Sequence, residues 1–168
     1  MMGRLVYRWL LLVGAGLGAS LLAVCGGSKP CISSKCSSGA LMKIPITTSA
    51  AALVGTTVTA CRNTTECYTA TLPEVPAAGS GGAGVYFTNA TSLRGNLSQS
   101  ATGAIELDLE WLLDAVQLQD GDHYVVTFTS AAGAATTMLD KTATYAPLPP
   151  SPEECAGSAT CSIANLGP

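Results

Sequence analysis

Residues 105–113 read IELDLEWLL, and this stretch decides the fold. Every odd position in it is apolar, whereas Glu106, Asp108 and Glu110 occupy even positions. Successive side chains of a β-strand point to opposite faces of a sheet, so the alternation predicts a strand with one face in a core and the other in water. The apolar face consists of Ile105, Leu107, Leu109, Trp111 and Leu113.

Four segments upstream also read as strands, because they are rich in apolar and β-branched residues and are bounded by turn residues. The first covers residues 40–48, and Pro45 within it indicates an edge strand, since proline has no N–H to donate to a ladder. Residues 54–61 and 67–72 flank a polar turn and predict a hairpin, and residues 85–89 add a short strand.

Downstream of residue 113, the turn sequence DGD at 120–122 precedes Tyr124 and an alternating run over residues 125–129. Small residues at 131–134 then separate this run from a further strand. The order resembles the E–F corner and the F–G hairpin of fibronectin type III and immunoglobulin-like sandwiches. In those folds a tyrosine at the start of strand F hydrogen-bonds to a backbone group just upstream, and the resemblance implies this role for Tyr124, with its ring in the core.

The resemblance also puts Trp111 on strand E. Strand signals dominate the chain and long helical periodicity is nearly absent, so we expect an all-β fold: an antiparallel β-sandwich of about seven strands over residues 40–146. Residues 73–84, rich in glycine, alanine and proline, predict a long loop inside this domain.

The N-terminal segment has the anatomy of a signal peptide. Arg4 and Arg8 supply positive charge, and an uncharged apolar run over residues 10–24 follows them. This run is shorter than the roughly 20 residues that a membrane-spanning helix needs. We therefore expect residues 1–24 to be cleaved rather than to remain as an anchor helix.

Residues 22–25, Leu-Ala-Val-Cys, resemble the lipobox of bacterial lipoproteins. The resemblance implies that Cys25 is alkylated with diacylglycerol and tethers the mature protein to a membrane. Val24 departs from the small residue usual at its position, so a cysteine that merely starts a conventionally cleaved, secreted protein is the alternative. Gly26, where an aspartate would direct retention at the inner membrane, implies sorting to the outer membrane.

The overall layout is similar to that of lipoproteins of myxobacteria and actinobacteria. It combines the lipobox, a short cysteine-bearing tether at 25–39, the CRNTTEC hairpin, the DGDHYVV corner, and a proline-rich tail with cysteines at 147–168. That resemblance implies a cell-envelope location and no particular activity.

The seven cysteines are an odd number, which leaves one thiol unpaired in an oxidising compartment. Lipidation of Cys25 accounts for the odd one. The other six form three close pairs, and local disulfides are the simplest arrangement, although the sequence leaves the connectivity open. These pairs are Cys31 with Cys36, Cys61 with Cys67, and Cys155 with Cys161. Their spacing and the single imidazole, His123, argue against a zinc site.

The net charge of the chain limits the classes of partner that it can bind. Without residues 1–24 the chain keeps six basic against eleven acidic side chains, a net charge of about −5, which excludes a basic nucleic-acid surface.

The carboxylates of residues 106, 108 and 110 are too far apart along one strand to bind one calcium ion together, so they predict a solvated face. His123 lacks the signature of a nucleophile or an oxyanion hole, so we expect no enzyme, no cofactor and no metal.

These observations lead to two functional hypotheses. The first is a membrane-anchored, exported lipoprotein with a non-catalytic binding or structural sandwich that meets a protein or a glycan. The second is a soluble secreted inhibitor or a hydrolase accessory module, exported without lipid.

Overall fold

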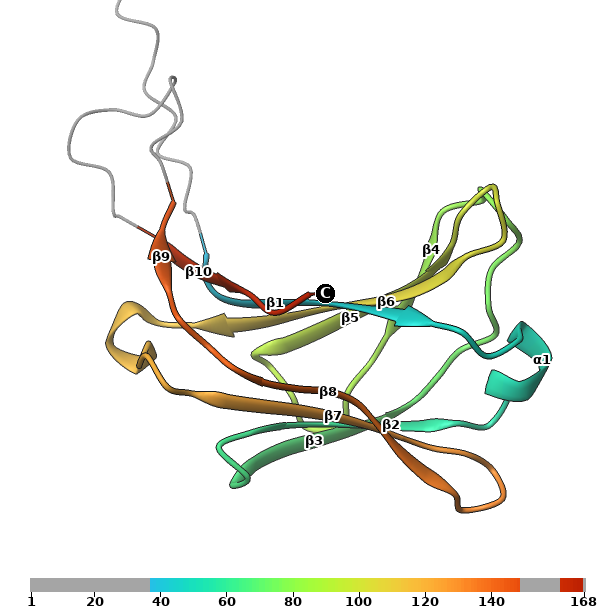
Figure 1. The fold of residues 1–168 in the computed structure, drawn as a ribbon, viewed down its shortest axis with the longest axis horizontal. Helices are drawn as coiled ribbons and strands as arrows, with labels where there is room; N and C mark the ends of the chain where they lie inside the picture. The colour runs from blue at the N-terminus through green and yellow to red at the C-terminus, as the bar shows by residue number, and fades with distance from the viewer. Residues whose placement is uncertain (1–36, 149–160, 168) are drawn as a thin grey trace, which may run out of the picture. The chain divides into compact units, whose positions relative to one another are not determined.

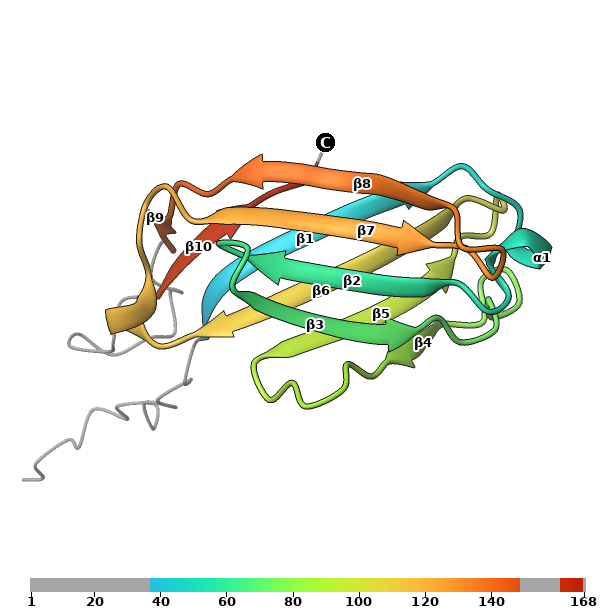
Figure 2. The ribbon, with the colours of Figure 1, turned by 90° about the horizontal axis from the view of Figure 1, so that it is seen from below.

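Two β-sheets packed face to face form the protein (Figures 1 and 2). The computed structural model describes residues 37–148 and 161–167. The expected all-β sandwich is confirmed, with ten strands among the described residues where about seven were expected. Two short helical turns, α1 (Ala50–Leu53) and η1 (Ala115–Gln117), connect strands at opposite ends of the sandwich.

Sheet A has six strands in the order β4-β5-β6-β1-β10-β9. Neighbouring strands run antiparallel except β1 and β10, which run parallel. The strands are β1 (Ser38–Ile46), β4 (Gly82–Val85), β5 (Leu93–Gln99), β6 (Ile105–Leu113), β9 (Ala146–Pro147) and β10 (Ser162–Asn165).

Sheet B has four antiparallel strands in the order β3-β2-β7-β8, which face the viewer in Figure 2. A register shift between Val126 and Thr127 marks a bulge in the pairing of β7 with β8. The strands are β2 (Thr57–Arg62), β3 (Glu66–Thr71), β7 (His123–Thr129) and β8 (Ala135–Thr142).

The alternation of residues 105–113 is confirmed, because the odd positions of β6 are buried and the even positions are partly exposed. Trp111 is fully buried between the sheets. Its ring lies 5.6 Å from that of Tyr68 and 5.5 Å from that of Tyr124, centroid to centroid, and both tyrosines belong to sheet B. The three rings therefore join the two sheets at the centre of the core.

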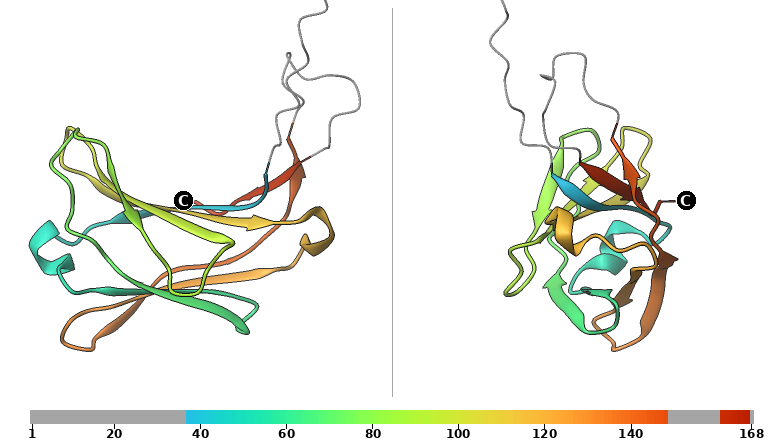
Figure 3. Two further views of the ribbon diagram at one scale, coloured as in Figure 1. Left: turned by 180° about the vertical axis from the view of Figure 1, so that it is seen from behind. Right: turned by 90° about the vertical axis from the view of Figure 1, so that its left-hand side faces the viewer.

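The strand order agrees with an immunoglobulin-type sandwich. The sequence β5-β6-β1 in one sheet and β3-β2-β7-β8 in the other corresponds to strands D-E-B and C′-C-F-G. Strand A would pair antiparallel with B in that fold, but here β10 pairs parallel with β1 (Figure 3). The C-terminal segment thus completes a sheet position that an N-terminal strand otherwise fills.

The sheets extend beyond the boundaries expected from the sequence. β1 begins at Ser38, inside the expected tether, and β9 and β10 reach into the expected tail. Ala164 of β10 is 1% exposed and Leu166 donates its backbone N–H to the carbonyl of Leu41. Residues 161–167 therefore belong to the sandwich, and no composition signal in the tail indicates this.

β1 is an edge strand over part of its length, and the expectation from Pro45 holds for that part. It pairs with β6 along its whole length, but its pairing with β10 covers only Gly39 to Leu41. Pro45 lies past that pairing, where no described strand adjoins β1 on the β10 side. The strand is central at its start and is an edge where proline occurs.

β5 is, like β9 and β10, a strand that the sequence did not indicate, and here the reason is that Gly95 interrupts its alternation. A side chain at Gly95 would lie 2.9 Å from Cβ of Val85 and 3.0 Å from Cδ2 of Leu109. Only glycine fits between β4 and β6 at this point. The expected strand at 85–89 is shifted as well, since β4 ends at Val85 and begins at Gly82, inside the expected loop.

The place of β10 in the core predicts unequal effects at two adjacent residues. Ala164→Asp puts a carboxylate among apolar side chains, and we expect it to lower the free energy of unfolding by at least about 3 kcal/mol. Asn165→Asp changes an exposed side chain, and we expect an effect within about 0.5 kcal/mol. Urea unfolding followed by tryptophan fluorescence measures both. Equal effects would show that the C-terminal segment does not pack on the sandwich.

Candidate functional site

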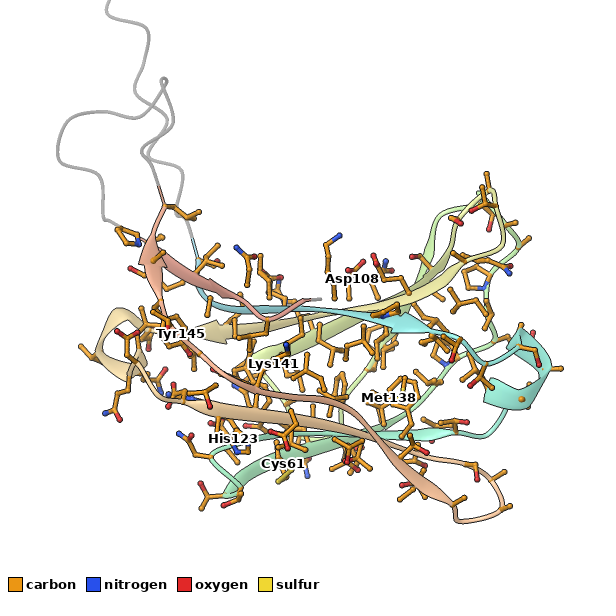
Figure 4. All side chains as sticks on the ribbon, viewed as in Figure 1. Cys61, Asp108, His123, Met138, Lys141 and Tyr145 are labelled. Atoms are coloured by element: carbon orange, nitrogen blue, oxygen red, sulfur yellow. A yellow bond between two sulfur atoms is a disulfide. The ribbon has the colours of Figure 1, made fainter. Side chains whose placement is uncertain are left out.

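Polar side chains from three neighbouring strands meet on the outer face of sheet A. In the ladder, Lys43 of β1 pairs with Asp108 of β6, which pairs with Asn96 of β5. The adjacent row consists of Leu41, Glu110 and Arg94 in the same strand order. Because residues paired across a sheet point to the same face, both rows lie on the side opposite the core. Figure 4 shows Asp108 on this outer face, directed away from sheet B.

Lys43 lies between two of the carboxylates of β6. Its Nζ is 3.6 Å from Oε1 of Glu106 and 3.8 Å from Oδ1 of Asp108. The Lys43 side chain is 67% exposed, so these ion pairs add little stability. They nevertheless show that the acidic strip is a mixed-charge surface.

Asp108 has one carboxylate oxygen shielded from solvent, although its side chain is 40% exposed, as much as that of Glu106. This oxygen, Oδ1, accepts no hydrogen bond from the described residues, since 3.8 Å to Lys43 is too long for one. Burial raises the pKa of the Asp108 carboxyl, the negative charge of Glu106 raises it further, and Lys43 lowers it in part. Only the exposed part of the carboxylate is open to a ligand from outside.

A hollow of about 340 Å³ lies over these rows. That volume is at the lower end of the range for small-ligand sites, about 300–1,000 Å³. The side chains around it combine two cations, two carboxylates, an amide and one apolar group: Lys43, Arg94, Asp108, Glu110, Asn96 and Leu41.

Tyr86 is an exposed aromatic residue that directly follows β4, outside the lining of the hollow. It is 88% exposed and follows β4, two residues after Gly84, which pairs with Asn96. A Cβ at Gly84 would lie 3.0–3.3 Å from the tyrosine ring and its hydroxyl, so the ring rests against the open side of the glycine. Gly82 gives space in the same way to the amide of Asn96.

We name this surface the sheet A face and define it by Leu41, Lys43, Tyr86, Arg94, Asn96, Asp108 and Glu110. In Figure 1 the outer side of sheet A, where these residues lie, is the upper side of the ribbon, away from sheet B. The sequence predicted its acidic strip as a solvated face. It did not indicate Arg94 and Asn96, because β5 was not recognised, and it did not indicate Tyr86.

A second polar cluster lies inside one end of the sandwich, around Asp122. This side chain is 2% exposed and accepts from Nε and Nη2 of Arg62 at 3.0 and 2.7 Å. Nδ2 of Asn63 donates to its other oxygen at 2.7 Å, and the hydroxyl of Tyr145 donates to Oδ2 at 3.2 Å. Arg62 also donates to the carbonyl of Gln117, so the cluster joins β2 to the connection between β6 and β7.

Burial alone would raise the pKa of the Asp122 carboxyl. Hydrogen bonds from Asn63 and Arg62, the guanidinium charge and the Tyr145 hydroxyl outweigh burial and hold this pKa below its usual value. Burial first, and then the neighbouring tyrosine, raises the pKa of Tyr145. The carboxylate is therefore ionised and the phenol neutral at physiological pH, as a structural ion pair requires.

Tyr124 is buried, as expected, but the predicted bond to an upstream backbone group is wrong. Its hydroxyl lies 2.7 Å from the hydroxyl of Tyr145. Since Tyr145 uses its own proton toward Asp122, Tyr124 is the donor in this pair. Tyr124, at the start of strand F, thus belongs to a buried network of hydrogen-bonded side chains. The sequence could not indicate this network because its members are up to 83 residues apart along the chain.

Of the predicted disulfides, the one between Cys61 and Cys67 is confirmed, with an S–S distance of 2.06 Å. It links the paired strands β2 and β3, so it closes a hairpin rather than joining the sheets. Cys161 is disulfide-bonded and buried. Cys25, Cys31, Cys36 and Cys155 lie outside the described residues, so lipidation and the remaining pairings stay predictions.

His123 lies on the outer side of sheet B, opposite to the side that Tyr124 faces. Its Nε2 is 2.6 Å from Oδ1 of Asp140, and no described serine, threonine or cysteine makes a hydrogen bond with its ring. Within residues 37–148 and 161–167, no three His, Cys, Asp or Glu side chains are grouped to hold a metal ion.

Comparison with known proteins identifies no relative, so the candidate function rests on the geometry of the site. No protein-family model matches the chain, and neither a curated protein nor a solved structure matches it. Over the part of the chain that the structure describes, no helix is long and apolar enough to cross a membrane.

The hydroxyl chain from Tyr124 through Tyr145 to Asp122 predicts unequal losses. Tyr145→Phe removes a donor to Asp122 and leaves the buried Tyr124 hydroxyl without a partner, so we expect a loss of about 2–3 kcal/mol in the free energy of unfolding. Tyr124→Phe leaves Asp122 satisfied and should cost about 1 kcal/mol. His123→Ala, on the exposed side, should cost about 0.5 kcal/mol or less.

Chemical denaturation of the three variants measures this order. A larger loss for Tyr124→Phe than for Tyr145→Phe would mean that the donor order in the chain is reversed or that Tyr124 bonds elsewhere.

Proposed function

We propose that the chain is an exported lipoprotein, held on a membrane through lipidated Cys25, and that its sandwich binds a partner without catalysis through the sheet A face. Residues 1–24 have signal-peptide anatomy, and setting Cys25 aside leaves six cysteines, a number that can pair completely. The Cys61–Cys67 disulfide supports export, because such bonds persist in oxidising compartments.

The observation that carries the binding role is the hollow on the outer face of sheet A, together with the exposed Tyr86 ring at the end of β4. Arg94 and Glu110, which line the hollow, form no ion pair with any described residue. An exposed aromatic side chain among convergent polar groups is typical of a binding surface. The fully bonded cluster around Asp122 is instead a structural element, because its polar atoms are already paired.

The single imidazole supports a non-catalytic role. His123 contacts Asp140 on the outer side of sheet B, and neither residue belongs to the sheet A face. At the hollow, the groups able to act as a nucleophile or base are the carboxylates of Asp108 and Glu110, about 7 Å apart along one strand. The amine of Lys43 is the other such group, and it is paired with Glu106 and Asp108. Binding is the chemistry that this arrangement favours.

Lipidation is tested by Cys25→Ser. We expect the variant to accumulate as an unprocessed precursor that does not incorporate an alkyne analogue of palmitate, whereas the wild-type chain does. Val24→Ala, which supplies the small residue usual in a lipobox, is the matched control and should be labelled at least as well as wild type. Processing and release of Cys25→Ser like wild type would favour the soluble secreted inhibitor or hydrolase accessory module instead. The position of Gly26 further predicts that the labelled protein fractionates with the outer membrane.

Binding through the sheet A face is tested by hydroxyl-radical footprinting of the protein in intact cell envelopes and after purification. We expect oxidation of Tyr86 to fall at least about threefold in the envelope, as a bound partner covers an aromatic ring that is otherwise in water. His123, on the outer side of sheet B, is the internal control and should be oxidised equally in both samples. Equal oxidation of Tyr86 in both samples would overturn the proposed binding surface.

A further inference from the structure

We propose that the sheet A face binds an uncharged glycan, with Tyr86 as the stacking platform and the rows over β5 and β6 as hydrogen-bonding partners. This inference rests on the proposed function, since it names the class of ligand for the same surface. It depends on three properties of the face: its mixture of donors and acceptors, the exposed ring, and its charge.

The donors and acceptors on this face alternate over a short distance. Arg94 and Asn96 supply donors from β5, and Glu110 and Asp108 supply acceptors from the neighbouring strand β6. A sugar hydroxyl is a donor and an acceptor at once, so adjacent hydroxyls on one ring match adjacent groups of opposite kind. The exposed part of the Asp108 carboxylate accepts from such a hydroxyl.

The ring of Tyr86 provides the apolar part of the site. One side of it rests on Gly84, and with 88% of the residue exposed the other side faces solvent. A flat ring beside polar groups suits the faces of a sugar, which carry C–H groups and are apolar. The glycines of β4 are part of this arrangement, because a side chain at Gly84 would displace the ring and one at Gly82 would displace the amide of Asn96.

The charge of the face argues against acidic polymers. The outer positions of β6 present Glu106, Asp108 and Glu110, against the two cations Lys43 and Arg94. Lys43 is already engaged by two of the carboxylates, so an anionic sugar would meet net negative charge. Sugars without charge avoid this repulsion.

The composition of the hollow favours a glycan over a protein partner. A stable protein interface has an apolar, desolvated centre. Charged and amide side chains predominate around the hollow, from Lys43, Arg94, Asn96, Asp108 and Glu110, with Leu41 as the outward-facing apolar one among them. A ligand rich in hydroxyl groups matches this composition better than an apolar protein surface does.

The test uses the full-length chain, solubilised in detergent and run in affinity gels that contain one soluble polysaccharide each. Xylan, mixed-linkage β-glucan, mannan and dextran are the uncharged probes, polygalacturonate is the anionic probe and chitosan is the cationic probe. We expect retardation by at least one uncharged polysaccharide and none by polygalacturonate. Retention by chitosan alone would mean that the carboxylates act as a cation-binding surface, and would overturn the proposal.

Variants then locate the binding. Tyr86→Ala should weaken retardation at least about fivefold, as expected for loss of an aromatic contact worth roughly 1 kcal/mol. Tyr86→Phe keeps the ring and should stay within about twofold of wild type. Val116→Ala, at a residue that is 90% exposed outside the sheet A face, is the matched control and should not change retardation. Glu110→Gln should weaken binding without affecting the free energy of unfolding, because its side chain has no described partner.

The outcomes separate this inference from the proposed function. If Tyr86 is protected in the envelope but no uncharged polysaccharide retards the protein, the binding surface stands and the glycan is wrong, with a protein as the partner. If an uncharged polysaccharide retards wild type and Tyr86→Ala equally, the glycan binds elsewhere and the assignment of Tyr86 is overturned. If Tyr86 is unprotected and nothing is retarded, both proposals fall.

Discussion

The ion pair between Asp122 and Arg62 is the constraint on which the rest of the structure depends. Arg62 is at an inward-facing position at the end of β2, where a cation would destabilise the core if it were unpaired. Asp122 neutralises it, and bonds from Asn63 and Tyr145 satisfy the remaining lone pairs of the carboxylate. One carboxylate therefore holds together the β2–β3 turn, the start of β7 and the segment after β8.

This cluster continues directly into the aromatic core. Tyr124 donates to Tyr145 at the polar end and contacts Trp111 edge-on at the apolar end. Trp111 belongs to sheet A and Tyr124 to sheet B, so the same side chain ties the polar cluster to the packing of the two sheets. Stability is thereby concentrated between the sheets, in residues whose polar groups are almost all paired.

The outer surface of sheet A has the opposite character. Its side chains are exposed, its ion pairs are weak, and an aromatic ring rests on a glycine instead of packing into the core. Substitutions there change little of what holds the sheets together, because the inner and outer faces of a strand alternate residue by residue. The same strand, β6, thus supplies the centre of the core on one face and the acidic row of the proposed binding surface on the other.

The sequence by itself determined the all-β class, the inner and outer faces of residues 105–113, the β2–β3 hairpin, and the burial of Tyr124. It favoured the Cys61–Cys67 disulfide and left the connectivity to the structure. Each of these depends on neighbouring residues, through the twofold period of a strand or the short span of a turn. The tertiary structure alone decided that β10 pairs with β1, that Gly95 marks a strand, that Asp122 neutralises Arg62 sixty residues away, and that Arg94 lies opposite Glu110 of the acidic row. Those facts depend on pairing between distant segments. The free energy of such contacts depends on residues far apart in the chain, so no local pattern of residues predicts it.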